Sequence, residues 1–141
     1  MYERLYYNAE IGYSFHYLKY TPKNASGEKM PLLVFMHGAG ERGNKDGSEL
    51  DRVASHGYFK QIRMGKEFPM MMVAPQCPRD HFWPSFIESL NRFLDYIIEN
   101  NNVDPDRIYL TGLSKAALLR GFGRSTMLSA LPLSRPFVAR V

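Results

Sequence analysis

The stretch RIYLTGLS (Arg107–Ser114) decides the fold class of this 141-residue chain. Its first five residues, Arg107–Thr111, have the β-branched, aromatic and leucine side chains of a core strand, and Gly112-Leu113-Ser114 follows without a break. A glycine and a serine at the end of a buried strand are typical of a sharp turn into a helix. The neighbours of this strand are expected among the other apolar runs of the chain.

Two unbroken apolar runs supply those neighbours, Leu32–Met36 (LLVFM) and Met70–Ala74 (MMMVA). Runs without polar alternation are typical of central parallel strands that are covered on both faces. Two earlier strands are expected at Leu5–Tyr7 and at Tyr13–Tyr20, and the second of these is rich in aromatic residues.

Two segments between the strands have helical patterns. Ser48-Glu49-Leu50-Asp51 has the spacing of a capping box and predicts a helix that begins there and ends near Gly65. From Ser85 the apolar residues recur on one helical face, and Ser85 with Glu88 forms a second capping-box pattern. The order of elements predicts an α/β domain with a mostly parallel sheet, flanking helices and antiparallel N-terminal strands.

The composition, 45% hydrophobic and 13% aromatic, fits one compact domain. No apolar run approaches the ~20 residues of a membrane span. The N-terminal residues show no secretory signal, so a cytoplasmic location is expected. Cys77 is the single cysteine and cannot form an internal disulfide, which favours a reducing compartment. It is expected to be a small buried hydrophobic residue.

The positive charge of the chain is concentrated near its end. The net charge is +4, and residues 107–141 hold six of the 18 basic residues and none of the 14 acidic ones. A domain that binds the phosphate backbone of a nucleic acid more often carries its basic residues on one face of a folded core. Neither nucleic acid nor a membrane is therefore an expected partner.

Two glycine-containing turns carry the candidate chemistry. A strained strand-to-helix turn can hold Ser114 as a nucleophile above the carboxyl edge of a sheet. The Gly38-Ala39-Gly40 turn can aim a backbone N–H at the oxygen on which acyl transfer builds negative charge. The second donor at such sites is normally the N–H of the residue after the serine, which is Lys115. Either turn alone could be an ordinary connection between a strand and a helix. The presence of both turns at the carboxyl ends of strands favours a catalytic site.

Four ordered motifs resemble one branch of a known superfamily. They are LVFMHGAGERG (Leu33–Gly43), APQCP (Ala74–Pro78), Trp83 and VDPDRIYLTGLS (Val103–Ser114). Together they resemble the esterase and peptidase-like branch of the α/β hydrolases, which includes feruloyl-esterase-like, polyhydroxyalkanoate-depolymerase-like and prolyl-oligopeptidase-like proteins. The resemblance covers roughly residues 10–114.

The resemblance implies an α/β-hydrolase fold, here only its N-terminal half, and a serine hydrolase that works through an acyl-enzyme. Its substrates would be small-molecule or polymeric carboxylic esters, or less readily peptides. Ser114 would be the nucleophile, and the backbone N–H groups of Ala39 and Lys115 would form the oxyanion hole. No cofactor is implied.

The resemblance ends directly after Ser114. The family continues with Ser-Met-Gly-Gly, whereas this chain reads Ser114-Lys115-Ala116-Ala117. In this fold an acidic residue and then a histidine follow the serine, yet residues 115–141 contain no Asp, Glu or His. Because these residues are missing, the chain is expected to be a truncated form of the fold. Serine without a base is a poor nucleophile, so the chain is also expected to be nearly inactive.

The composition therefore divides the chain into two parts. Residues 1–114 are expected to form the N-terminal part of a hydrolase domain, and residues 115–141 an atypical basic tail that a shifted reading frame would explain. Two alternatives to an enzyme stay open: a non-catalytic fragment, and a protein that binds a membrane or nucleic acid through the tail. The tail contains Gly121, Gly123, Pro132 and Pro136, which disfavour a long amphipathic helix.

The remaining candidate residues are expected to be structural. His37 resembles the family's loop histidine, and a structural role is favoured for it over that of general base. Glu41 and Arg42 are expected to pair inside the protein in preference to touching substrate. No Cys/His spacing suits zinc, and no glycine-rich phosphate loop is present. The other histidines are expected at the surface: His16, His56 and His81.

Overall fold

The structure is a computed structural model that describes residues 1–23, 27–81, 83 and 87–112. The elements in chain order are β1 (Glu3–Tyr7), β2 (Phe15–Tyr20), β3 (Met30–Met36), η1 (Ala39–Glu41), η2 (Leu50–Ser55), α1 (Gly57–Arg63), β4 (Met71–Pro75), α2 (Ile87–Asn100) and β5 (Val103–Gly112). The two short elements η1 and η2 are 3₁₀ helices. Every predicted strand is present, although several bounds differ.

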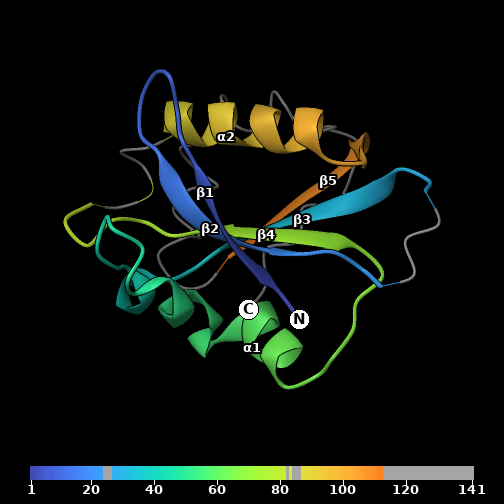
Figure 1. The fold of residues 1–141 in the computed structure, drawn as a ribbon, viewed down its shortest axis with the longest axis horizontal. Coiled ribbons are helices and arrows are strands. Elements are labelled where there is room, and N and C mark those ends of the chain that lie inside the picture. The colour runs from blue at the N-terminus through green and yellow to red at the C-terminus, as the bar shows by residue number, and fades with distance from the viewer. Residues whose placement is uncertain (24–26, 82, 84–86, 113–141) are drawn as a thin grey trace.

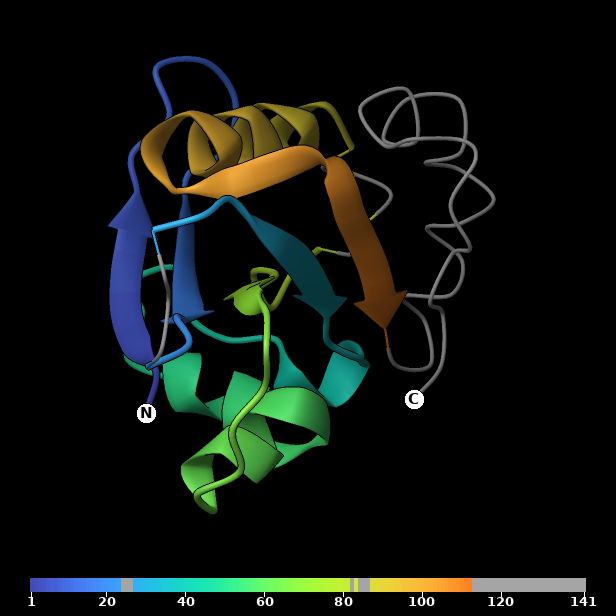
Figure 2. The ribbon, with the colours of Figure 1, turned by 90° about the vertical axis from the view of Figure 1, so that its right-hand side faces the viewer.

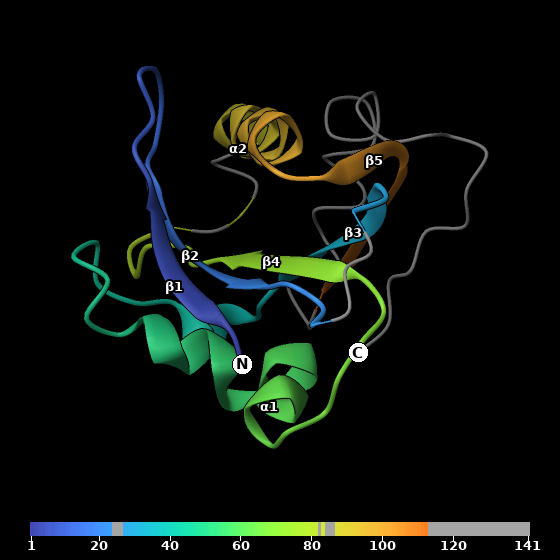
Figure 3. The ribbon, with the colours of Figure 1, turned by 45° about the vertical axis from the view of Figure 1, so that its right-hand side comes forward.

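The strands form one five-stranded mixed sheet in the order β1-β2-β4-β3-β5. β3 is parallel to both β4 and β5, whereas β1 pairs with β2, and β2 with β4, in antiparallel fashion. Figures 1 and 3 show α2 on one face of the sheet and α1 on the other. This arrangement confirms the predicted α/β fold class with antiparallel N-terminal strands.

β3 lies inside the sheet and is buried on both faces. Its even-numbered core residues belong to the hydrophobic cluster under α2, and its odd-numbered ones to the cluster under η2 and α1. The five buried residues of the strand are Leu32, Leu33, Val34, Phe35 and Met36. Because both faces are covered, no position of the strand can be polar without cost, which explains the unbroken apolar run.

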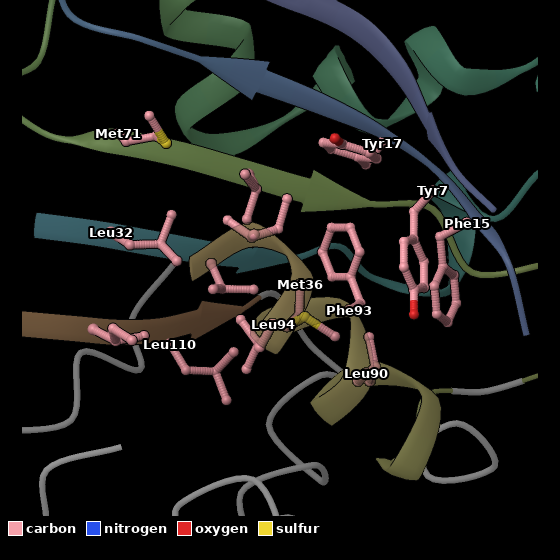
Figure 4. Packing of buried hydrophobic residues seen from close by; sticks show 14 of the residues in the cluster. Tyr7, Phe15, Tyr17, Leu32, Met36, Met71, Leu90, Phe93, Leu94 and Leu110 are labelled. Carbon is pink, nitrogen blue, oxygen red and sulfur yellow. The ribbon is translucent and has the colours of Figure 1, made fainter. Parts of the chain in front are cut away.

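Helix α2 anchors the larger cluster, seen from close by in Figure 4. Its buried face consists of Leu90, Phe93, Leu94 and Ile97. The Phe93 ring packs edge to face on Tyr7, Phe15 and Tyr17, with ring centroids 5.5, 5.9 and 5.0 Å away. The predicted helical face is therefore confirmed. The capping pattern at Ser85 lies outside the described residues.

The helix predicted to begin at Ser48 is wrong in its first half. η2 covers Leu50–Ser55, and α1 starts only at Gly57, whose φ of 70° interrupts the helical backbone. Ser48 does not act as the cap: its N–H binds the Asp46 carboxylate, and η2 has no side-chain capping bond. Glycine is favoured at that positive φ because a Cβ would also come within 2.8 Å of the Phe35 ring. The predicted end near Gly65 is correct.

β5 is longer than predicted and contains a wide bulge. Met30 pairs with Val103, but Leu32 pairs with Ile108, so the β5 side carries extra residues between the two pairs. Asp104 holds this bulge together, because its carboxylate accepts from the Asp106 N–H and from the Arg107 guanidinium, each at 2.9 Å. Figure 2 shows the resulting bend of β5. Pro105 is tolerated in this bulge because its missing N–H would not have bonded to the neighbouring strand.

Within the part of the chain that the structure describes, no helix is long and apolar enough to cross a membrane.

Candidate functional site

The carboxyl ends of β3 and β5 lie side by side, which is where the sequence predicts the site. Phe35 pairs with Thr111 and Met36 with Gly112. Ala39 lies three residues beyond Met36 in the sequence, and Ser114 lies two residues beyond Gly112. Ala39 opens η1; Ser114 and Lys115 lie outside the described residues. In the sequence, the three predicted site residues therefore come shortly after the ends of two adjacent strands. Their roles stay predictions.

His37, the first residue after β3, is buried and makes two hydrogen bonds. Its Nδ1 donates to the carbonyl of Gly38 at 2.6 Å, and its Nε2 accepts the backbone N–H of Cys77 at 2.9 Å. An acceptor at Nε2 requires the neutral imidazole with its proton on Nδ1. Burial lowers the pKa of His37 from 6.5 to about 4, so the ring is neutral at pH 7. Both nitrogens are occupied, which fits a structural role and not that of a base.

Trp83 packs against His37. Its indole N–H donates to the His37 carbonyl at 3.0 Å, and the two rings lie 5.0 Å apart between centroids. The Cys77 thiol is buried beside them and contacts the His81 carbonyl at 3.3 Å. Burial raises the pKa of Cys77 to about 12, so the thiol is protonated and unreactive at neutral pH. The expectation of a buried cysteine is confirmed.

Gln76 braces the loop that follows β3. Its amide Nε2 donates to the backbone carbonyls of Glu41 at 3.0 Å and of Glu49 at 2.8 Å. The amide also packs against Gly43, where an added Cβ would come within 2.4 Å of it. Backbone bonds join the same loop to the segment after β4: Gly43 N–H donates to Cys77, and Arg79 N–H donates to Gly43. The turn that begins with Ala39 is thus tied to a second loop at its far end.

Charged side chains lie near the hydrogen bonds of Gln76. The Glu49 carboxylate is bonded by Arg79 and by Arg52, and the hydrogen bond from Arg79 lowers the pKa of Glu49. Arg42 donates to the His81 carbonyl at 3.2 Å, so its guanidinium is used within the fold. Glu41 is also buried, and an internal role for both residues agrees with the expectation.

The sequence analysis missed the roles of Gln76 and of the Cys77 backbone. Both belong to the motif Ala74–Pro78, which carried part of the resemblance without a function attached to it. A polar glutamine directly after an apolar strand was the available signal, because such a residue is either solvated or satisfies buried backbone groups. Among the residues that the structure describes, no group of three or more potential metal ligands occurs.

Solved structures similar to this chain include esterases and a peptidase. A thermostable esterase is 26% identical, with a TM-score of 0.62 over 90% of this chain and 37% of its own. The chain has an α/β-hydrolase fold. A ferulic acid esterase from the anaerobic fungus Anaeromyces mucronatus is 16% identical, with a TM-score of 0.55 over 83% of this chain and 50% of its own. An acylaminoacyl peptidase is 18% identical, with a TM-score of 0.52 over 89% and 21%.

The chain matches only part of each similar protein. The chain spans half or less of the length of each of these three proteins. No family model matches the sequence. No curated protein matches it either. The likeness is one of fold, and it agrees with the resemblance to the first half of an α/β hydrolase.

Proposed function

We propose that this chain carries the nucleophile and the oxyanion hole of a serine esterase. Ser114 is the nucleophile, and the backbone N–H groups of Ala39 and Lys115 bind the developing oxyanion. The observation that carries the proposal is the pairing of Met36 with Gly112, because it starts both functional turns from adjacent parallel strands. In open α/β sheets such carboxyl edges are where ligands bind.

The proposed chemistry is acyl transfer. The Ser114 hydroxyl oxygen attacks the ester carbonyl, and the negative charge that develops on the carbonyl oxygen is met by the two backbone donors. The alcohol then leaves, the acyl group stays on the serine as an ester, and water releases it as a carboxylic acid. Esters are favoured over peptides because alcohols leave more readily than amines, and because two of the three similar structures above are esterases.

The base for this reaction is not His37. Its two nitrogens are bonded and its pKa is about 4, so it cannot take the serine proton at neutral pH. Residues 115–141 supply no Asp, Glu or His. We therefore expect the 141-residue chain to hydrolyse aryl esters no faster than its Ser114→Ala variant.

The nucleophile position can be tested without a base by the Ser114→Cys variant. A thiol at a strand-to-helix turn, facing backbone N–H groups, should ionise below the ordinary pKa of about 8.5. The matched control is Ser55→Cys, because Ser55 is exposed at the end of η2. Wild-type protein gives little background, since burial raises the Cys77 pKa to about 12.

Both variants are titrated with iodoacetamide from pH 5 to 9 and then incubated with p-nitrophenyl acetate. The proposal predicts a lower thiol pKa and faster acetylation for Ser114→Cys than for Ser55→Cys. Equal pKa values and equal acetylation rates in the two variants would overturn it.

A further inference from the structure

The turn that would supply one oxyanion donor does not by itself fix the direction of that donor. The donor is the N–H of Ala39, and glycines precede and follow it at positions 38 and 40. Glycine has no Cβ and its backbone can adopt many conformations, so the peptide group between Gly38 and Ala39 can take more than one orientation. Contacts from outside the turn are therefore needed to hold this peptide group in a single orientation.

The imidazole of His37 makes such a contact. Its Nδ1–H donates to the Gly38 carbonyl at 2.6 Å, and the N–H of Glu41 donates to the same oxygen at 3.3 Å. The peptide bond between Gly38 and Ala39 is trans, so its carbonyl and its N–H point in opposite directions. The hydrogen bond from His37 therefore also fixes the direction of the Ala39 N–H, which points away from the imidazole ring.

The backbone of Cys77 determines which nitrogen of His37 carries the proton. The Cys77 N–H donates to Nε2 at 2.9 Å, and only an unprotonated nitrogen can accept this bond. The proton of the neutral ring is therefore on Nδ1, where it bonds to the Gly38 carbonyl. The other tautomer would place two N–H groups against each other at Nε2 and two acceptors against each other at Nδ1. Because the ring is buried, water could not replace the two lost bonds without cost.

Gln76 holds the other end of η1. Its side-chain amide donates to the Glu41 carbonyl at 3.0 Å and to the Glu49 carbonyl at 2.8 Å. Its backbone N–H donates to the His16 carbonyl at 3.0 Å, which ties the residue to the strand β2. Two neighbouring residues after β4 thus hold η1 at both ends: Gln76 directly, and Cys77 through the imidazole. Their own position is set by the sheet.

We propose that the segment Gln76–Cys77, which follows β4, sets the direction of the Ala39 N–H. His37 and Gln76 are then positioning residues for the oxyanion hole. The inference rests on the proposed esterase function, because that function gives the Ala39 N–H its role. Neither side chain contacts the ester, since the imidazole is buried and the Gln76 amide bonds to two backbone carbonyls. Both act through the peptide groups of the turn.

The expected effect on the reaction follows from the way an oxyanion hole works. Donors that already point at the developing charge need no reorganisation during the reaction, and loss of one donor lowers the rate about 100- to 1,000-fold. A donor that is present but free to rotate keeps part of this effect. We therefore expect the acyl-transfer rate to fall about tenfold or more when the hydrogen bond to the Gly38 carbonyl is removed.

The test compares two reactions of the Ser114→Cys variant of the 141-residue chain. Acetylation by p-nitrophenyl acetate builds negative charge on a carbonyl oxygen, whereas alkylation by iodoacetamide displaces iodide and forms no oxyanion. The ratio of the two rates therefore reports the oxyanion hole separately from the reactivity of the thiol. Two second substitutions separate the two bonds of His37, because Asn places an amide N–H near the position of Nδ1, whereas Gln reaches the position of Nε2.

His37→Gln should lower the acetylation rate about tenfold or more and leave the alkylation rate within about twofold, because it keeps an acceptor for Cys77 but no donor for the Gly38 carbonyl. His37→Asn should keep the acetylation rate within about threefold, since its amide can donate to that carbonyl. Gln76→Leu should also lower acetylation more than alkylation, because it releases the far end of η1. The control is His56→Gln, an exposed histidine, which should change neither rate.

The fluorescence of Trp83 shows whether each variant is folded, and Gln76→Leu carries the same comparison if His37→Gln does not fold. An unchanged ratio of acetylation to alkylation in both variants would overturn the inference. Equal losses of acetylation in His37→Asn and His37→Gln would also overturn it, because they would assign the effect to packing of the ring. Failure of the proposed function gives a different result, since Ser114→Cys would then be acetylated no faster than Ser55→Cys.

Discussion

The buried neutral histidine of the candidate site predicts a specific loss of stability in acid. In the folded chain the pKa of His37 is about 4, whereas an unfolded histidine has a pKa of about 6.5. Below pH 6.5 the unfolded chain binds a proton at this position and the folded chain does not. The stability that the neutral ring contributes is therefore fully present above pH 6.5 and is lost as the pH falls toward 4.

The size of the effect follows from the two pKa values. One unit of pKa difference corresponds to about 1.4 kcal/mol, so lowering the pH from 7 to 4.5 should remove about 2 kcal/mol through His37 alone. Domains of this size are stable by about 5–15 kcal/mol, so the loss is measurable. Other groups also titrate in this range, and a comparison between variants is needed to isolate this one.

The comparison uses His37→Gln and the matched control His56→Gln, because His56 is exposed at the surface. Urea unfolding is followed at pH 7, 5.5 and 4.5 by the fluorescence of Trp83, the single tryptophan, which lies beside His37. At pH 7 the wild type should be more stable than His37→Gln. This difference should shrink by about 2 kcal/mol at pH 4.5. If the difference between the wild type and His37→Gln stays constant over this pH range, His37 is not held neutral by burial and the argument is refuted. The exposed control His56→Gln should change the free energy of unfolding at pH 7 by about 0.5 kcal/mol or less.

Three further outcomes follow from the packing around the site. Phe93→Ala should lower the free energy of unfolding by about 3–5 kcal/mol in urea titrations, because it empties the centre of the α2 cluster, whereas exposed Met64→Ala should change it by about 0.5 kcal/mol or less; similar losses in both would contradict the packing. Gln76→Leu keeps the side-chain volume but leaves two backbone carbonyls without their donor, so the free energy of unfolding should fall by about 1–3 kcal/mol in the same assay. An unchanged urea midpoint would show that the hydrogen bonds of Gln76 do not stabilise the fold. The Cys77 thiol should not react with Ellman's reagent at pH 7.5 until urea unfolds the protein, and immediate reaction would contradict its burial.

The central sheet could be predicted from the sequence because burial on both faces leaves a clear pattern. Leu32–Met36 and Met70–Ala74 are apolar at every position, and both are core strands. The face of α2 could be predicted for a related reason, since only one side of that helix is covered. The relation between β3 and β5 then followed from the rule that strands of an α/β unit are parallel.

The irregular parts could not be predicted because they depend on contacts distant in sequence. The bulge in β5 is stabilised by the Arg107 guanidinium bonding to the Lys29 carbonyl, 78 residues away. Ser48 looked like a helix cap, yet the local turn around Asp46 takes its N–H. The bonds of Gln76 and His37 join loops that only the folded sheet brings together. For Ser114 and Lys115, the prediction comes from the identity of the residues in the motif Val103–Ser114 and directly after it.

The central claim is that the turns after β3 and β5 together form an oxyanion hole. A crystal structure of the chain in which residues 113–116 are resolved would test it most directly. The account predicts that the backbone nitrogens of Ala39 and Lys115 both lie about 2.7–3.1 Å from one common point next to the Ser114 hydroxyl. It also predicts a strained backbone at Ser114 between the strand and a helix. If the two N–H groups point to opposite sides of the sheet, the proposed esterase site does not exist in this chain.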